Sequence, residues 1–297
     1  MIDNRKEPMV SIVIPSHNNR RRDLVDNISS IVKGKYKNWT ITVIDQANTD
    51  DTYSHIRKRF PKIKVIRNSK NSGATGGKNQ GIRLLPRGAD YILFLDSDFV
   101  AETNAISELV LSINNKPEYG GATAKILYYH SPNIVQYAGS SVGLITGINW
   151  SNSGPDDGRF DKLIPTEGAG GAVLVKREVV KKVGFFDEAF FPVYYEDADY
   201  CYRMGKAGYK ILYVPTSRFY HKAPFQNTEA WLNNAYLTAR NKLIFMKKHS
   251  VFFIFFLVIY PIFPLFYLLI SLKYRRYDAL REYMRGIIDG FGYIIRN

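Results

Sequence analysis

Four short apolar runs divide the first third of the chain, and each one ends in polar or acidic residues. They are residues 10–14, 40–44, 64–66 and 91–95, with helix-compatible stretches of roughly 20 to 25 residues between them. Near-continuous Val, Ile and Leu runs at this spacing are typical of buried parallel strands joined by helices. The pattern predicts an α/β fold with a mostly parallel sheet flanked by helices.

The residues that follow these runs carry much of the polar chemistry of the first half. Pro15 and His17 follow the first run, Asp45 follows the second, and Asp96 and Asp98 follow the fourth. In open α/β sheets a ligand binds outside the carboxyl ends of the strands. We therefore expect a ligand site along this edge of the sheet.

The rest of the chain divides into a mixed middle part and an apolar tail. Residues 120–225 are rich in glycine and aromatic residues and indicate a mixed sheet with long loops, and residues 226–249 indicate a helix. Residues 251–272 are 22 uncharged residues, and at about 1.5 Å per residue a straight helix of this length crosses a bilayer core. We predict a main domain over residues 1–245, followed by a membrane-associated helical hairpin and amphipathic tail over residues 246–297.

Two features of the apolar tail leave its relation to the membrane open. Pro261 and Pro264 interrupt it near the middle, and basic residues flank it on both sides. Proline disfavours a straight helix, and positive charge on both flanks defines no orientation. The tail is compatible with a peripheral or re-entrant mode, with a single span, and with a buried hairpin that packs on the main domain or on a second subunit of a homo-oligomer.

The chain is basic, with a formal net charge of +14, and it contains one cysteine, Cys201. A basic surface suits nucleic acid, anionic lipid or phosphorylated substrates, and charge alone does not choose between them. One cysteine excludes an internal disulfide and a zinc site built from several cysteines. The polar start of the sequence has no apolar signal segment, which predicts a cytoplasmic main domain.

Asp96-Ser97-Asp98 is the first motif with a chemical interpretation. Residues two apart in an extended segment point to the same side, so both carboxylates can face one ligand. Hard oxygen ligands of this kind bind Mg²⁺ or Mn²⁺ beside a diphosphate. A solvated turn after a strand would account for the same residues.

A second motif is the glycine-rich run at residues 71–81. Glycines allow the backbone to approach a ligand closely, and Lys78 is positioned to meet a phosphate. The run is not a Walker loop, because Ser72 stands where glycine is required and Asn79 where Ser or Thr follows the lysine. A flexible loop is the alternative interpretation.

The densest motif covers residues 185–203, where five carboxylates lie among eight aromatic residues. A carboxylate beside a second carboxylate and apolar rings becomes a better proton acceptor, as a general base requires. In a helix, Asp199 and Arg203 are four apart and can pair, which leaves Glu196 and Asp197 for substrate. A solvated acidic helix start is the alternative, although it does not account for so many aromatic rings.

Taken in order, these segments resemble the GT-A family of inverting glycosyltransferases, family 2, which includes rhamnosyl- and galactofuranosyltransferases. The resemblance implies a GT-A catalytic domain, a nucleotide-diphosphate sugar as donor, and a glycan or lipid-linked acceptor used at the cytoplasmic face of a membrane. It covers roughly residues 9–245 and consists of residues 11–18, 43–51, 71–81, 94–98, 168–175, 183–188 and 196–200, together with Arg203, Gly208 and His221.

The resemblance also implies a role for each matching position. Asp197 would be the catalytic base, and Glu196 would lie against acceptor hydroxyls. Asp98 and His221 would bind Mn²⁺ or Mg²⁺ together with the diphosphate. The donor would be held by Pro15, His17, Asp45, Asn71, Lys78 and Asp96.

Two other functions remain open at this point. A polyprenyl-phosphate glycosyltransferase uses an acceptor that is already ionised and needs no base, so the acidic, aromatic segment within residues 168–222 argues against it. A non-catalytic protein that binds nucleic acid would explain the net charge of +14, but its carboxylates would repel phosphate backbones without a metal, and we expect no nucleic-acid partner. The absence of a QxxRW motif argues against a processive polysaccharide synthase.

Overall fold

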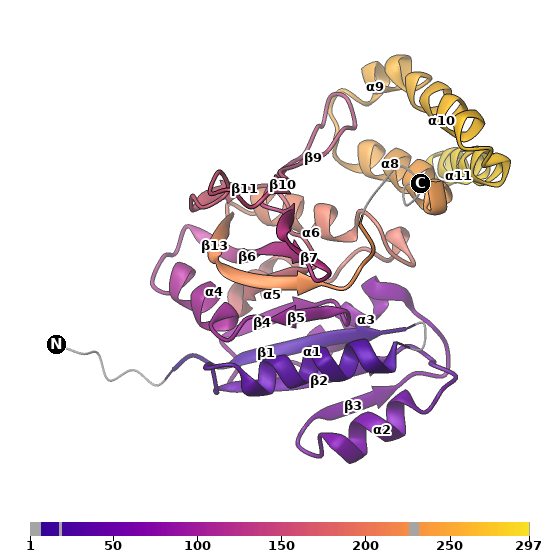
Figure 1. Ribbon diagram of the computed structural model, residues 1–297. Coiled ribbons are helices and arrows are strands. Elements are labelled where there is room, and N and C mark those ends of the chain that lie inside the picture. Colours follow the sequence, from indigo (N-terminus) through magenta and orange to yellow (C-terminus); the bar gives the residue numbers. More distant parts are fainter. Residues whose placement is uncertain (1–6, 18–19, 226–231, 297) are drawn as a thin grey trace.

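The computed structural model describes residues 7–17, 20–225 and 232–296. The end of the first motif, at residues 18–19, and the start of the helix expected over residues 226–249 lie outside these ranges. The described residues form an 11-stranded sheet with helices on both faces, and further helices gather at the end of the molecule away from β2 and β3 (Figure 1).

The first half of the chain builds the parallel part of the sheet, as predicted. Strands β1 (Val10–Ser16), β2 (Trp39–Asp45), β3 (Lys64–Arg67) and β4 (Tyr91–Leu95) lie in the order β4-β1-β2-β3, and all their pairings are parallel. Helices α1 (Arg21–Lys33), α2 (Thr52–Arg59) and α3 (Gly73–Arg83) connect them. The carboxyl ends of these strands therefore lie along one edge.

The second half adds strands of mixed direction. Strand β12 (Ala172–Lys176) pairs antiparallel with β4 and with β6 (Tyr119–Tyr128), and β13 (Lys210–His221) runs parallel to β6. The remaining strands are β5 (Phe99–Ala101), β7 (Ser131–Tyr137), β8 (Ser140–Ser141), β9 (Trp150–Ser151), β10 (Gly154–Pro155) and β11 (Ile164–Thr166). Helices α4 (Ala105–Ile113), α5 (Arg177–Val183) and α6 (Glu196–Lys206) and the short 3₁₀ helix η1 (Glu188–Phe190) complete this half.

Alternate residues of the strands face opposite layers of the core, because side chains alternate along a strand. In β1, Ile12 and Ile14 belong to the cluster under α1 and α4, whereas Val13 belongs to the cluster under α5 and α6. Cys201 of α6 is buried in this second cluster. The sheet is thus covered on both faces, as expected for a parallel arrangement.

Helices α8 (Ala235–His249), α9 (Phe253–Ile259), α10 (Ile262–Lys273) and α11 (Tyr277–Arg296) follow the sheet domain. Helix α11 packs along α8, where Gly286 and Gly290 lie so close that an added Cβ would press on Ala239 and Leu243. The two helices therefore form a tight pair, and α9 and α10 lie beside them (Figure 1).

The two prolines of the apolar tail interrupt it less than the sequence pattern indicated. Tyr260 and Pro261 lie between α9 and α10, and both keep right-handed helical backbone angles. Pro264 falls in the first turn of α10, where a backbone N–H has no partner within the helix. The chain reverses only after α10, around Arg275, whose φ is 54°.

The segment Phe253–Lys273, which contains α9 and α10, has the length and apolar composition to cross a membrane, with a mean hydropathy of 2.5. Only 17% of this window is buried inside the protein. Most of its apolar side chains therefore face outward, unlike those of a core helix in a soluble domain.

The close packing of α3 on β1 can be tested at Gly81, where an added Cβ would overlap the side chain of Val13. We expect Gly81→Ala to lower the free energy of unfolding by about 1–3 kcal/mol, because the strand cannot move aside. Gly205→Ala in α6, where nothing lies within 4 Å, is the control and should be neutral or stabilising by up to about 1 kcal/mol. Denaturant unfolding of the full chain measures both, and equal stabilities would contradict the packing.

Candidate active site

The acidic pair Glu196 and Asp197 forms the first turn of α6 and is held by a buried lysine. Lys78 of α3 donates hydrogen bonds to Glu196 Oε1 at 3.2 Å and to Asp197 Oδ1 at 2.5 Å. The side chains of Lys78 and Glu196 are 2% and 6% exposed, and that of Asp197 is 20% exposed. Asp197 is therefore the carboxylate of the pair that solvent can reach.

Charges at this centre perturb one another because they are buried close together. Burial alone would lower the pKa of Lys78, but Asp197 and Glu196 outweigh it and the pKa is raised. Burial raises the pKa of Glu196, Lys78 opposes this, and Asp197 adds to it. Burial likewise raises the pKa of Asp96, to about 7. Lys78 opposes this rise, and the neighbouring carboxylates of Asp197, Asp98 and Glu196 add to it. The structure thus brings Asp96 and the acidic pair into one electrostatic site.

The loop before the acidic pair has an unusual backbone and is held from two sides. Tyr194 and Tyr195 have φ values of 76° and 71°, a conformation that is uncommon for residues other than glycine and that persists only when neighbours enforce it. The side-chain amide of Asn241 in α8 donates to the carbonyls of Val193 and Tyr194 at 3.0 and 2.8 Å. On the other side, the backbone N–H of Ala74 donates to the Pro192 carbonyl at 2.7 Å. The position of the acidic pair thus depends on α3 and α8 together.

Asp98 and His221, the predicted metal ligands, lie side by side, Asp98 directly before β5 and His221 at the end of β13. His221 Nε2 is 3.2 Å from Asp98 Oδ2, and His221 Nδ1 is 2.7 Å from Gln136 Oε1. Arg20 also donates a hydrogen bond to Asp98 Oδ2. Burial would raise the pKa of Asp98, but His221 and Arg20 outweigh it and the pKa is lowered. One carboxylate oxygen thus attracts two positive or hydrogen-bond-donating groups.

Asp45 ends β2 as predicted and carries an unsatisfied oxygen. It is fully buried, and its Oδ1 accepts from the backbone N–H and the side-chain amide of Asn48 at 2.9 and 2.8 Å. Its Oδ2 has no hydrogen-bond partner in the part of the chain that the structure describes, although Arg67 Nε is 3.7 Å away. A buried acceptor without a donor can be satisfied by an N–H of a ligand.

The other residues predicted to bind a donor surround the start of α3. His17 Nδ1 lies 2.9 Å from the backbone oxygen of Gln46. Pro15 packs against Gly77, where an added Cβ would be too close. Asn71 Oδ1 accepts from the backbone N–H of Gly73 at 2.8 Å and so orders the first residue of α3.

The glycine-rich run at residues 71–81 differs from its sequence interpretation, because most of it is the helix α3. Its glycines provide close contacts within the protein: Gly73 lies against Pro192, Gly77 against Pro15, and Gly81 against Val13. Lys78 projects from this helix to the acidic pair. The glycines therefore allow close packing of α3 on other parts of the protein.

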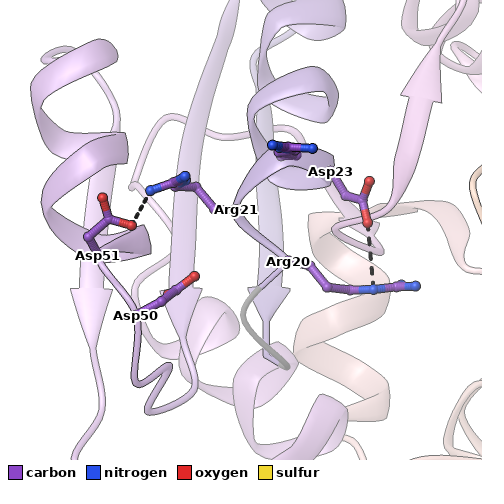
Figure 2. A pocket seen from close by; sticks show the side chains of 6 residues that line it. Arg20, Arg21, Asp23, Asp50 and Asp51 are labelled. Carbon is purple, nitrogen blue, oxygen red and sulfur yellow. Dashed lines mark hydrogen bonds and ion pairs between the residues drawn. The ribbon is translucent and has the colours of Figure 1, made fainter.

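A cavity of about 440 Å³ lies beside the start of α1 and the loop after β2 (Figure 2). Arg20 pairs with Asp23 at 3.6 Å and with Asp98, so it links the cavity to the predicted metal ligands. A cavity of this size is typical of sites for small ligands. Its lining consists of Arg20, Arg21, Arg22, Asp23, Asp50 and Asp51.

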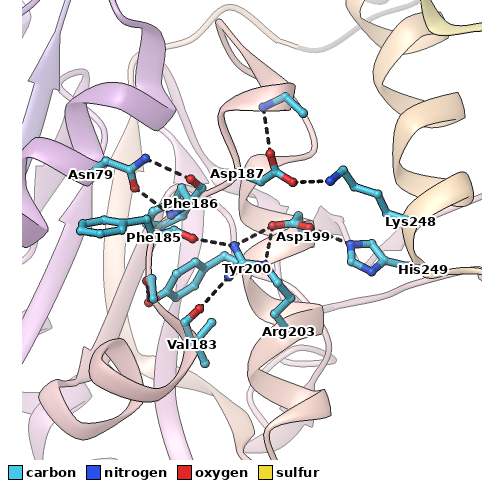
Figure 3. A network of polar contacts seen from close by, with 12 residues as sticks. Asn79, Val183, Phe185, Phe186, Asp187, Asp199, Tyr200, Arg203, Lys248 and His249 are labelled. Atoms are coloured by element: carbon cyan, nitrogen blue, oxygen red, sulfur yellow. Dashed lines mark hydrogen bonds and ion pairs between the residues drawn. The ribbon is translucent and has the colours of Figure 1, made fainter. Parts of the chain in front are cut away.

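A polar network connects α6 to the end of α8 (Figure 3). Arg203 pairs with Asp199 at 2.7 Å, which confirms the expected pairing within the helix, and His249 Nε2 lies 2.7 Å from the other Asp199 oxygen. Lys248 pairs with Asp187 at 2.8 Å. The helix that leads into the apolar segment is thus fastened to the helix that carries the acidic pair.

Sequence reasoning missed several residues that shape this site. Arg20 had a visible signal, since it begins a run of three arginines just after the first strand. Gln136, Asn241 and His249 had none, because each is an ordinary polar residue whose partner lies far away in the sequence. Such contacts become visible only when the strands and helices are assembled.

The sequence model of the family "Glycosyl transferase family 2" matches residues 11–184, more than half of the chain. The chain belongs to this family of sugar-transferring enzymes, as its motifs indicated. Its fold resembles that in the "Crystal structure of GalNAc-T7 with UDP, GalNAc and Mn2+", with a TM-score of 0.61 and 18% identity over 78% of this chain and 48% of that one. The predicted GT-A-type α/β fold is confirmed.

Relatives with assigned names include bacterial, archaeal and human proteins. The chain is 26% identical over 207 residues to an N-acetylglucosaminyl-diphospho-decaprenol L-rhamnosyltransferase of Mycobacterium tuberculosis, covering 62% of this chain and 67% of the relative. It is 25% identical over 255 residues to the low-salt glycan biosynthesis hexosyltransferase Agl10 of Haloferax volcanii, covering 82% and 76%. The chain spans 67% and 76% of the length of these two relatives, and 24% of the length of a further one from Sinorhizobium fredii.

The ionic cluster at Lys78 yields a stability prediction. Lys78→Met should lower the free energy of unfolding by about 3–5 kcal/mol, because it leaves two carboxylates without their counter-charge. Adding Glu196→Gln should recover part of the loss, and a double-mutant cycle in denaturant measures the coupling. Lys70→Met, at an exposed position, is the control and should change stability by less than about 0.5 kcal/mol. A loss at Lys78 no larger than at Lys70 would contradict the cluster.

Proposed function

We propose that this protein is an inverting glycosyltransferase that moves a sugar from a nucleotide-diphosphate donor to a hydroxyl of a lipid-linked or glycan acceptor. The observation that carries the proposal is the acidic pair Glu196–Asp197, held by Lys78 next to Asp96. Membership of glycosyltransferase family 2 supports the reaction class. The name of the mycobacterial relative, which includes a diphospho-decaprenol, supports a lipid-linked acceptor.

Asp197 is the general base in this proposal. It is the more exposed member of the pair, so an acceptor hydroxyl can reach it while Glu196 binds neighbouring hydroxyls from a buried position. Asp197 takes the hydroxyl proton as the acceptor oxygen bonds to the anomeric carbon and the bond to the diphosphate oxygen breaks. One displacement inverts the anomeric centre, and Lys78, which we assign to the acidic pair, keeps both carboxylates in position.

Asp98 and His221 fit a divalent metal by their chemistry, since a carboxylate oxygen and an imidazole nitrogen both suit Mn²⁺, and carboxylate oxygen suits Mg²⁺. Among the described residues no group of three or more His, Cys, Asp or Glu is arranged around one point, so phosphate and water oxygens would supply the other ligands. When bound, such an ion stabilises the charge on the leaving diphosphate. Gln136 contacts His221 Nδ1 and so orients Nε2 toward Asp98.

The donor nucleotide is assigned to the edge formed by Pro15, His17 and Asp45, close to the cavity beside the start of α1. The unsatisfied Asp45 Oδ2 would accept an N–H from the base. Asp96 would approach the ribose. Asn71 would act along the donor through the start of α3, which it orders.

The reaction can be tested by incubating the full chain with Mn²⁺ or EDTA against UDP-, GDP-, dTDP- and CDP-sugars and measuring released nucleotide and sugar transfer. We expect metal-dependent release from one donor. Asp197→Asn should reduce transfer by about 10²-fold or more, because the amide cannot take the acceptor proton, while donor affinity stays nearly unchanged.

Asp157→Asn provides the matched control, because Asp157 is exposed and, among the described residues, pairs only with the nearby Arg159. It should retain transfer. Substantial transfer by Asp197→Asn would show that the base is another residue. If the folded protein releases nucleotide from none of these donors and shows no metal-dependent nucleotide binding, the proposal is wrong.

We also propose that residues 246–297 hold the enzyme at the cytoplasmic face of a membrane. Ile254 and Val258 of α9 are 75% and 72% exposed, and the apolar surface extends to the loop at residues 143–150, where Gly147 packs on Phe256 and Trp150 is exposed. An exposed tryptophan beside apolar helices with basic flanks is typical of protein surfaces that enter the interfacial layer of a bilayer.

Membrane contact can be measured by flotation of the full chain with vesicles of phosphatidylcholine and phosphatidylglycerol. Ile254→Ser with Val258→Ser should weaken vesicle binding by about tenfold or more, because two exposed apolar side chains are lost from the lipid contact. Val32→Ser, on the exposed part of α1, should bind as the unmodified chain does. If the double variant floats as before but elutes from gel filtration as a monomer where the unmodified chain elutes as a dimer, this face instead contacts a second copy of the chain.

A further inference from the structure

Lys242 of α8 is a buried lysine that has no counter-charge among the residues that the structure describes. Its residue is 8% exposed, and its ammonium lies 3.6 Å from the ring centre of Phe263 in α10. Within residues 7–17, 20–225 and 232–296 it has no hydrogen bond or ion pair. Burial lowers the pKa of Lys242 to about 8, and no neighbouring charge opposes this. The protein thus keeps an unneutralised ammonium inside an apolar junction.

Such an arrangement is unfavourable for the protein alone. Burial removes much of the hydration of the ammonium, and contact with an aromatic ring offsets only part of this loss. Other basic residues of α8 are differently placed: Lys248 pairs with Asp187, His249 contacts Asp199, and Lys247 is exposed. Lys242 is therefore set apart from them as a charge that an anionic ligand would satisfy.

Lys242 also lies between the acidic pair and the apolar helices. The preceding residue, Asn241, holds the carbonyls of Val193 and Tyr194 just before Glu196. On the other side, Phe263 belongs to α10, whose outer face exposes apolar side chains such as Leu265 and Leu269. A ligand with an apolar chain and a sugar would have its linking group near this junction.

We propose that Lys242 binds a phosphate of a lipid-diphosphate acceptor, with the lipid chain along α10 and the sugar hydroxyl at Asp197. This inference rests on the proposed transfer to a lipid-linked acceptor and adds the residue that binds the acceptor phosphate. The donor diphosphate is assigned to Asp98 and His221, where Arg20 is the adjacent cation. The two diphosphates of the reaction are thereby bound by different groups.

The test measures binding and thermal unfolding of the full chain in detergent, without any donor sugar. The probes are geranylgeranyl diphosphate, its uncharged alcohol geranylgeraniol, inorganic pyrophosphate, and phosphatidylglycerol. We expect geranylgeranyl diphosphate to raise Tm and the other three to raise it much less. Equal stabilisation by pyrophosphate would assign the site to free anions, and equal stabilisation by phosphatidylglycerol would assign it to bilayer headgroups; either result overturns the proposal.

Lys242→Met should bind geranylgeranyl diphosphate about tenfold more weakly or worse, as expected for the loss of a charged hydrogen bond. Its ligand-free Tm should rise, because an unpaired buried charge has been replaced by an apolar side chain of similar shape. Lys242→Arg should retain most of the binding, and Lys247→Met should match the unmodified chain. A lysine that serves only the fold would give the opposite pattern, with lower Tm and unchanged binding.

A measurement on the unmodified chain guards against a variant that does not fold. Geranylgeranyl diphosphate, but not geranylgeraniol, should protect Lys242 from acetylation by acetic anhydride, as read by mass spectrometry, with Lys247 as internal reference. Equal labelling of Lys242 with and without the diphosphate overturns the proposal. Metal-dependent donor hydrolysis by the unmodified chain, measured separately and without an acceptor, tests the glycosyltransferase assignment, so failure of this site is distinguishable from failure of that assignment.

Discussion

The ion cluster of Lys78, Glu196 and Asp197 is the contact on which the rest of the site depends. Two carboxylates share one ammonium in a nearly closed environment, where attraction is strong but the loss of hydration is large. The arrangement is stable only if α3 and α6 keep a fixed distance. The glycines of α3, which bring it close to β1 and to the Pro192 loop, provide that distance. The packing of α3 in the core therefore determines the geometry of the candidate site.

The parallel half of the fold could be predicted because its signal is local. Three of the four apolar runs are mostly buried, the run at β3 is partly buried, and the structure places a strand at each of them. The segment at residues 71–81 was harder, since three of its glycines disfavour a helix in isolation and are required by packing. The pairing of the strands after β5 could not be predicted from the hydrophobic pattern, because these strands pair with segments distant in the sequence, as β13 does with β6.

The sequence could propose members of the candidate site but not their arrangement. Asp98 and His221 were named as partners through the family resemblance, and they lie together in the fold. The sequence offered no indication that Lys78 reaches the acidic pair, 119 positions away from Asp197. Nor could it reveal that Asn241 of α8 holds the loop before that pair, or that His249 contacts Asp199 in α6. These contacts depend on how α3, α6 and α8 meet, which no local pattern encodes.

Cys201, the single cysteine of the chain, is buried on the inner side of α6, and burial raises the pKa of its thiol. A thiol that is both covered and protonated reacts slowly with maleimides or methanethiosulfonates. The natural protein is therefore a low-background host for site-directed labelling. A cysteine introduced on the outer face of α9 or α10 would carry a spin label or fluorophore almost alone, and its signal would report the depth and tilt of those helices in a bilayer.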